Sequence, residues 1–238
     1  MKTTLIIALL LGGGVFVVSK TYQSPATTEV LLLRDITDSG FVHIQATDIA
    51  RLYNLKDDNR WNGAEFSFSN LSDVSFNKTT TATLAPVNKW LSNELQRDKE
   101  VKQFEGTVAK ILSDAENDSP GKRNSSLYIP IAQALIQLKQ SKAQRRILII
   151  SSDLMENETD ISFYSKKEFA LIESMPETIE TIFEKKAVLP SLVGIEVYLI
   201  YQPTTAENDA TYRVVSEFYK TLLESKGATV NISANLSN

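Results

Sequence analysis

Short apolar runs alternate with stretches of helical period along most of this 238-residue chain. Residues 29–34 and 146–150 are nearly continuous in Leu, Ile and Val and too short for helices, which is typical of strands buried on both faces of a sheet. These two strands should be central. The other runs that predict strands are 195–201, 228–232, and the alternating pair 64–69 and 79–84, which should be more exposed and near an edge.

Stretches of helical period separate these strands and predict helices that cover both faces of a parallel sheet. Pro130 is tolerated only in a first turn, so the helix that contains it should begin near Ser126. Pro176 should divide one stretch in two, and Gly227 should end the last helix. The stretches are 104–115, 127–139, 166–186 and 215–223. We expect one α/β domain, residues 27–238.

Residues 1–24 have the character of an export segment. Lys2 precedes an apolar run over residues 5–18, about 14 residues long, which is the length of a secretory signal core and short of the roughly 20 that span a bilayer. No small-residue cleavage site follows the run closely, so a cleaved signal peptide and an uncleaved membrane anchor both stay open. In either case the domain should be extracytoplasmic: periplasmic, cell-surface or secreted.

Composition excludes several classes of function. The 25 Lys and Arg residues against 29 Asp and Glu residues provide no basic field, which argues against a nucleic-acid partner. The chain has no cysteine and one histidine, His43, so disulfides, thiolate sites and most hydrolase or zinc centres are disfavoured. Glycine-rich phosphate loops and a Gly-x-Ser-x-Gly elbow are also absent from the sequence. We expect a protein that is not an enzyme.

Oxygen-bearing side chains follow the two most apolar strands, where the ligands of a parallel sheet bind. Asp35 and Asp153 each come just past one of these strands, and the chain after Asp35 carries alternating hydroxyls. Such an oxygen-only set suits Mg²⁺ or Mn²⁺ and suits zinc or copper badly. Ser126 could replace Ser125 in the set, or could instead cap the following helix. The expected metal ligands are Asp35, Thr37, Ser39, Ser125 and Asp153.

This pattern resembles the von Willebrand factor A domain family and its metal-ion-dependent adhesion site. The family's Asp-x-Ser-x-Ser stands here as Asp35-Ile-Thr37-Asp-Ser39, and its Thr-Asp-Gly stands as Ser152-Asp153-Leu154, without the glycine. Its Thr-x-hydrophobic-x-x-Ala-Leu is matched at residues 125–131, with Ser for Thr and Pro for Ala. The resemblance covers about residues 30–232. It implies a Rossmann-like fold with a mostly parallel sheet and an antiparallel edge strand, and a bound cation that captures an Asp or Glu carboxylate of a partner protein.

Other interpretations stay open beside the cation-dependent binding module. Members of the family that have lost the metal serve as scaffolds. The segment after Asp35 also resembles the nucleophile motif of haloacid-dehalogenase-type, magnesium-dependent phosphotransferases, but the position of their acid/base Asp holds Thr37 here, which cannot shuttle a proton near neutral pH. Taken singly, Asp35 and Asp153 could be turn residues that close strands, and His43 could be a satisfied structural side chain.

Overall fold

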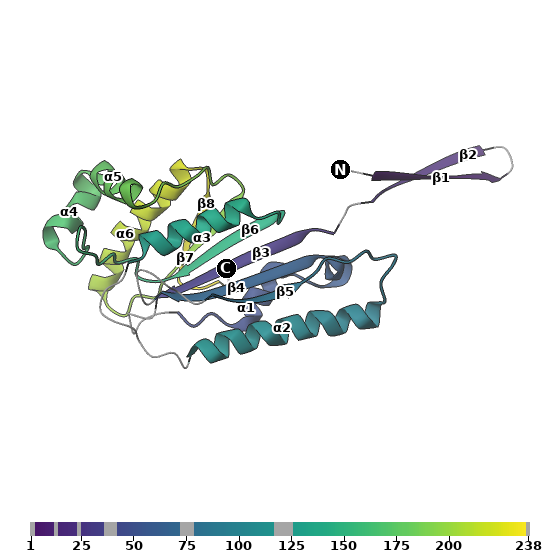
Figure 1. Ribbon diagram of the computed structural model, residues 1–238, viewed down its shortest axis with the longest axis horizontal. Coiled ribbons are helices and arrows are strands. Elements are labelled where there is room, and N and C mark those ends of the chain that lie inside the picture. The colour runs from purple at the N-terminus through teal and green to yellow at the C-terminus, as the bar shows by residue number, and fades with distance from the viewer. Residues whose placement is uncertain are drawn as a thin grey trace.

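Six strands form one sheet in the order β5-β4-β3-β6-β7-β8 (Figure 1). This computed structural model describes residues 3–11, 14–22, 25–35, 42–71, 79–116 and 126–236. All neighbouring strands are parallel except β4 and β5, which are antiparallel. The predicted Rossmann-like α/β fold, with a mostly parallel sheet and an antiparallel edge strand, is therefore confirmed. The strands are β3 (Thr27–Asp35), β4 (Gly63–Leu71), β5 (Thr79–Leu84), β6 (Arg145–Ser151), β7 (Ile195–Ile200) and β8 (Thr229–Ser233).

Helices cover both faces of this sheet, and the alternation of side chains along β3 divides the core between them (Figure 1). Val30 and Leu32 pack in the cluster under α1 (Ala46–Tyr53) and α2 (Glu94–Glu116). Leu31 and Leu33 pack in the cluster on the other face. The helices of that face are α3 (Tyr128–Gln140), α4 (Lys166–Ser174), α5 (Pro176–Lys186) and α6 (Ala206–Ser225).

One expectation about exposure is wrong. The strand predicted at 64–69 is not an exposed strand, because β5 and β3 pair with β4 on its two sides and Phe66 and Phe68 are buried. Of the two strands predicted near an edge, only β5 is an edge strand, and its first three residues are exposed. The alternation of polar and apolar residues along β4 predicted an exposed face, but the polar residue Ser67 is buried. Its hydroxyl shares a hydrogen bond with Thr81 of β5.

The element ends lie where the backbone chemistry predicts them. Pro130 is in the first turn of α3, and Pro176 begins α5 directly after the end of α4. Gly227 has a φ of 97°, and its N–H donates to the carbonyl of Glu224 at 2.9 Å while the next N–H reaches back to Leu223. This is a Schellman ending, which requires the left-handed conformation that glycine favours. The short helix α1 and the 3-10 helix η1 (Asp57–Trp61) have no counterpart among the sequence predictions.

The amino-terminal segment forms an antiparallel hairpin of β1 (Thr3–Leu11) and β2 (Gly14–Tyr22), which projects away from the sheet (Figure 1). Within the described residues, no helix has the length and apolar character needed to cross a membrane. The assignment of residues 1–24 as a signal peptide or membrane anchor stays a prediction.

Candidate functional site

The carboxyl ends of β3 and β6 bring Asp35 and the segment that begins at Ser152 together. Arg34 pairs with Ser151 in the parallel register, so the next residue of each strand lies at the same level. Asp35 is 1% exposed, and the Ser152 hydroxyl donates to its Oδ2 at 3.0 Å. Asp153 is adjacent and partly exposed, and its Oδ1 accepts the N–H of Met155 at 2.9 Å. The two predicted carboxylates therefore belong to one strand-end edge.

The expectation that both carboxylates lie past their strands holds for Asp153 and is wrong for Asp35, which is the last residue of β3. The cause is the length of β4, whose Leu71 extends the pairing by one residue to Asp35. Three other predicted ligands, Thr37, Ser39 and Ser125, lie outside the described residues. The chain beyond residue 41 returns to this edge, because the Ser151 hydroxyl donates to the carbonyl of Val42 at 3.2 Å.

Leu154 occupies the position where the resembled motif has glycine, and its backbone adopts the conformation that glycine favours. Its φ is 63°, in the left-handed region that costs a residue with a Cβ about 1–2 kcal/mol. Its side chain is fully buried, and its N–H donates to the Ser152 hydroxyl at 2.9 Å. Burial of the leucine side chain offsets the backbone cost, so this turn keeps a glycine-like path without a glycine.

Glu156, rather than Ser126, caps α3, the helix that follows the predicted ligands Ser125 and Ser126. The Glu156 carboxylate is fully buried and accepts the N–H groups of Leu127 and Tyr128, the latter at 2.9 Å. Burial raises the pKa of Glu156 to about 7, against the lowering effect of these two hydrogen bonds. Sequence reasoning missed this residue; the available signal was a glutamate that directly follows two apolar residues, Leu154 and Met155.

Four buried hydroxyls have no hydrogen-bond partner among the described residues, and two of them bear on the predicted ligand set. One is Ser126 Oγ, in a side chain that is 4% exposed, so the alternative that Ser126 caps the helix is wrong. The other is the hydroxyl of Tyr212 on α6. Burial, and secondarily the negative charge of Asp153, raises the pKa of Tyr212 above its ordinary value. Buried polar atoms nearly always have a hydrogen-bond partner. Each of these two hydroxyls is therefore a candidate to bind a ligand from outside the protein.

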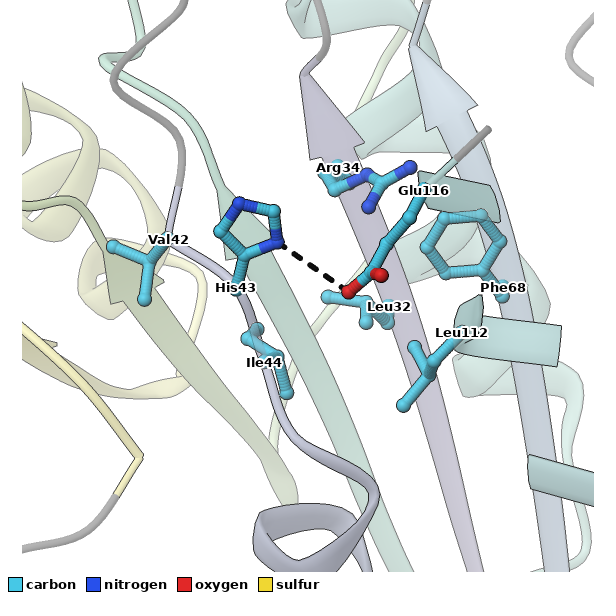
Figure 2. Close-up of a pocket in the computed structure, with 8 residues that line it drawn as sticks. All are labelled: Leu32, Arg34, Val42, His43, Ile44, Phe68, Leu112 and Glu116. Carbon is cyan, nitrogen blue, oxygen red and sulfur yellow. Dashed lines mark ion pairs between the residues drawn. The ribbon is translucent and has the colours of Figure 1, made fainter. Parts of the chain in front are cut away.

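On the other face of β3, a shallow pocket brings Arg34, His43 and Glu116 together (Figure 2). The Arg34 guanidinium lies over the Phe68 ring, donates to Asn70 Oδ1 at 3.0 Å and also donates to a carbonyl of α2. His43 is 57% exposed in its side chain, and its Nδ1 lies 3.5 Å from the carboxylate of Glu116. These contacts engage the Arg34 guanidinium and the His43 imidazole, and they link the end of α2 to the sheet.

Among the residues that the structure describes, no three His, Asp or Glu side chains come together in a group that could hold a metal ion. The sequence pattern assigns two carboxylates to the site, those of Asp35 and Asp153. The remaining predicted ligands are hydroxyls. The described part of the site therefore offers negatively charged carboxylate oxygens and neutral hydroxyl oxygens at one edge of the sheet.

No family model and no curated protein matches this chain. Among solved structures, it is similar to the D319A mutant of the PilB minor pilin from Streptococcus sanguinis, with 13% sequence identity and a TM-score of 0.47. The match covers 95% of this chain and 63% of that chain. The present chain therefore spans less than two thirds of the length of the pilin that it matches.

Proposed function

We propose that this chain is an extracytoplasmic binding module of the von Willebrand factor A type that captures a partner protein through a divalent cation, Mg²⁺ or Mn²⁺. The observation that carries the proposal is the strand-end edge where Ser152 links Asp35 to the segment of Asp153. Carboxyl ends of parallel strands are where open α/β sheets bind their ligands. The proposal assigns the chain no catalytic residue.

The chemistry of the donor set fits such a cation. Two carboxylates, from Asp35 and Asp153, balance a charge of +2, and neutral hydroxyls add further hard oxygen ligands. Thr37, Ser39 and either Ser125 or Ser126 would supply these hydroxyls. The buried Ser126 Oγ, which has no partner among the described residues, favours Ser126 as a ligand. The negative charge of these ligands does not exceed the charge of the cation. The bound cation can therefore attract an Asp or Glu carboxylate of a partner.

The backbone of Leu154 supports the resemblance independently of these ligands. A leucine with positive φ is an uncommon conformation that proteins tend to retain at functional sites. Here it falls at the residue where the family's Thr-Asp-Gly motif has glycine, one residue after Asp153. The turn that presents the second carboxylate thus has a backbone conformation that glycine adopts readily, which supports the comparison with the motif.

The apolar segment over residues 5–18 is proposed to direct export and, if retained, to tether the domain to a membrane. An isolated two-stranded hairpin is marginally stable in water, and its outer edges leave backbone groups unpaired. In lipid such a segment is favoured as a helix, because a helix satisfies every backbone hydrogen bond within itself.

Cation binding is tested by thermal unfolding and titration calorimetry of the full chain in a non-ionic detergent. Mg²⁺ or Mn²⁺ at 100 times its dissociation constant should stabilise the fold by about 2.7 kcal/mol, which corresponds to a rise of about 5–10 °C in melting temperature. Asp153→Asn keeps an acceptor for the N–H of Met155 but removes the charge, so it should abolish the rise. Asp58→Asn removes the same charge from a carboxylate paired with Lys89 and should leave the rise intact.

The metal-free scaffold is the alternative that the same experiment addresses. If neither cation binds at millimolar concentration and the melting temperature stays constant, the cation-dependent module is refuted and the scaffold interpretation remains. A rise that Asp153→Asn and Asp58→Asn reduce equally would also refute it, because cation binding would then reflect overall charge.

A further inference from the structure

Exposed apolar side chains gather at the end of the sheet opposite the candidate cation site. We call this end, formed by the amino ends of the parallel strands, the amino pole. Trp90, Leu91 and Leu95 lie in and just after the loop from β5 to α2 and are 69%, 86% and 74% exposed. Val188 and Val193 lie in the loop that leads into β7 and are 69% and 63% exposed. Five of the eight large apolar side chains exposed in the described part of the chain therefore belong to this pole.

The chain enters the domain from its apolar amino-terminal segment at the same pole. The carbonyl of Ala26 accepts the N–H of Gly63 at 2.7 Å, and the N–H of Ala26 donates to Asn62 Oδ1. A Cβ on Gly63 would meet both Thr27 Oγ1 and Pro86 Cδ within 3 Å, so the start of β3 lies against the loop that carries Trp90. Figure 1 shows the hairpin leaving the domain at this end.

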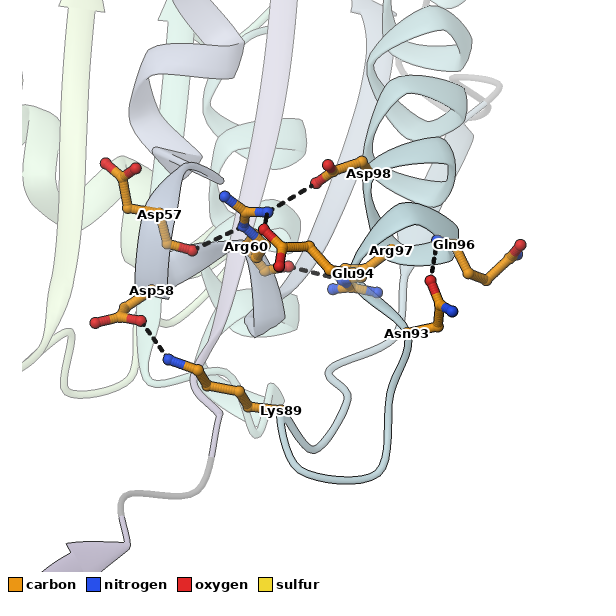
Figure 3. Close-up of polar contacts among 9 residues, drawn as sticks. All are labelled: Asp57, Asp58, Arg60, Lys89, Asn93, Glu94, Gln96, Arg97 and Asp98. Atoms are coloured by element: carbon orange, nitrogen blue, oxygen red, sulfur yellow. Dashed lines mark hydrogen bonds and ion pairs between the residues drawn. The ribbon is translucent and has the colours of Figure 1, made fainter.

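A buried arginine holds that loop in place. Arg97 of α2 is 2% exposed and donates to the carbonyls of Arg60, Asn62 and Ala85 at 2.6, 2.6 and 3.0 Å. Figure 3 shows the contact between Arg97 and Arg60, together with the ion pair between Lys89 and Asp58, whose charged atoms lie 2.7 Å apart. Exposed side chains on an ordered loop lose little backbone entropy when they bind, so the loop is prepared for a contact.

The distance from the apolar segment to the domain is short. Eight residues, 19–26, separate residue 18 from the first residue of β3, and eight extended residues span at most about 26–29 Å. If residues 5–18 are inserted in a bilayer, the amino pole stays within that distance of its surface. A tether of this length raises the local concentration of the pole at the surface to about the millimolar range.

We propose that the amino pole rests on the membrane surface, with Trp90, Leu91 and Leu95 on one side of the chain's entry and Val188 and Val193 on the other. Tryptophan is the side chain most enriched at the interface between lipid and water, and apolar residues on both sides of the entry suit a planar surface. This orientation turns the candidate cation site away from the bilayer, toward partners. The inference rests on the membrane tether of the proposed function.

The test uses the full chain reconstituted in phosphatidylcholine vesicles whose acyl chains carry bromine, which quenches nearby tryptophan fluorescence. The chain has two tryptophans, and Trp61 is buried, so Trp61→Phe leaves Trp90 as the reporter. Bromine should quench Trp90 by at least about half, and Leu91→Ser with Leu95→Ser should weaken the apolar contact about tenfold or more and remove most of the quenching. Ile232→Ser, an exposed apolar residue of β8, is the matched control and should leave the quenching unchanged.

Each outcome decides the proposal. Chains that float with the vesicles but show no bromine quenching of Trp90 refute it while the tether stands. Trp90 emission that changes with the protein-to-lipid ratio but is not quenched by bromine identifies a second copy as the occupant and also refutes it. Chains that do not float refute the tether and this inference together, and calorimetry with Mg²⁺ on the same sample then shows whether the cation site stands. If Trp61→Phe unfolds, the difference in quenching between the wild type and Trp90→Phe gives the same readout.

Discussion

Replacing Glu156 with glutamine should change the stability of this protein in a pH-dependent way. The carboxylate is fully buried and caps the first turn of α3 through the N–H groups of Leu127 and Tyr128. Two effects oppose each other here. Burial disfavours the charged form, whereas the helix N-terminus and its N–H groups favour it. Burial is the larger effect, and it raises the pKa of Glu156 from 4.5 to about 7.

The sign of the pH dependence follows from this raised pKa. Between pH 4.5 and pH 7 the folded chain retains a proton that the unfolded chain has already released. The contribution of Glu156 to stability is therefore complete below pH 4.5, declines as the pH rises, and reaches its lower limit above pH 7. The difference between the two pKa values corresponds to about 3 kcal/mol. Glutamine keeps the shape and one acceptor oxygen but does not titrate.

Urea unfolding of the wild type and Glu156→Gln at intervals from pH 4.5 to pH 8, with EDTA present, measures this difference. The free energy of unfolding of the variant, relative to the wild type, should rise by about 3 kcal/mol across the range. Glu173→Gln, which removes an exposed carboxylate of α4, is the control and should show a constant difference. A constant difference for Glu156→Gln would show that the helix N-terminus balances burial, and a difference that falls with rising pH would show that it outweighs burial. Either result would refute the reasoning.

Three further substitutions test individual buried or partly buried side chains. Arg97→Met should destabilise the fold by at least about 3 kcal/mol in urea unfolding, because three backbone carbonyls lose their donor; a loss no larger than that of the exposed Arg213→Met would contradict this. Without cation, Asp35→Ala should cost about 1–3 kcal/mol, since it leaves the buried Ser152 hydroxyl without its acceptor, and Asp153→Ala should cost less, since Asp153 is partly exposed. Equal losses in EDTA would show that the two carboxylates have the same structural role.

The strands and helices were predictable because each is encoded over a few residues. Continuous apolar runs predicted β3 and β6, and proline and glycine placed the ends of α3, α5 and α6. Periodicity failed to predict exposure where the burial of a strand depends on the strands and helices that pack against it. The strand at 64–69 alternates, yet β5 covers its open edge, and both of its phenylalanines are buried in the cluster under α1 and α2. Helix α1 was missed because it is only eight residues long.

The candidate site also has a part that could be predicted from the sequence and a part that could not. Asp35 and Asp153 were assigned from their places after apolar strands, and both lie at the predicted edge. The role of Glu156 could not be predicted, because its partners Leu127 and Tyr128 are 29 and 28 residues away along the chain. The hydrogen bond from Ser152 to Asp35 spans 117 residues. Neither contact leaves a local pattern.

The sequence by itself determined the α/β class, the order of the six sheet strands along the chain, the oxygen-bearing side chains at the strand ends and the apolar character of the amino terminus, because all of these follow from composition and short-range periodicity. Only the tertiary structure decided which side chains meet. The parallel register brings Asp35 level with Ser152, and the folded chain sets Trp90 and Val193 at the pole where β3 begins. These placements depend on long-range strand pairing and on burial, which assign a polar or apolar side chain its role through neighbours that are distant in the sequence.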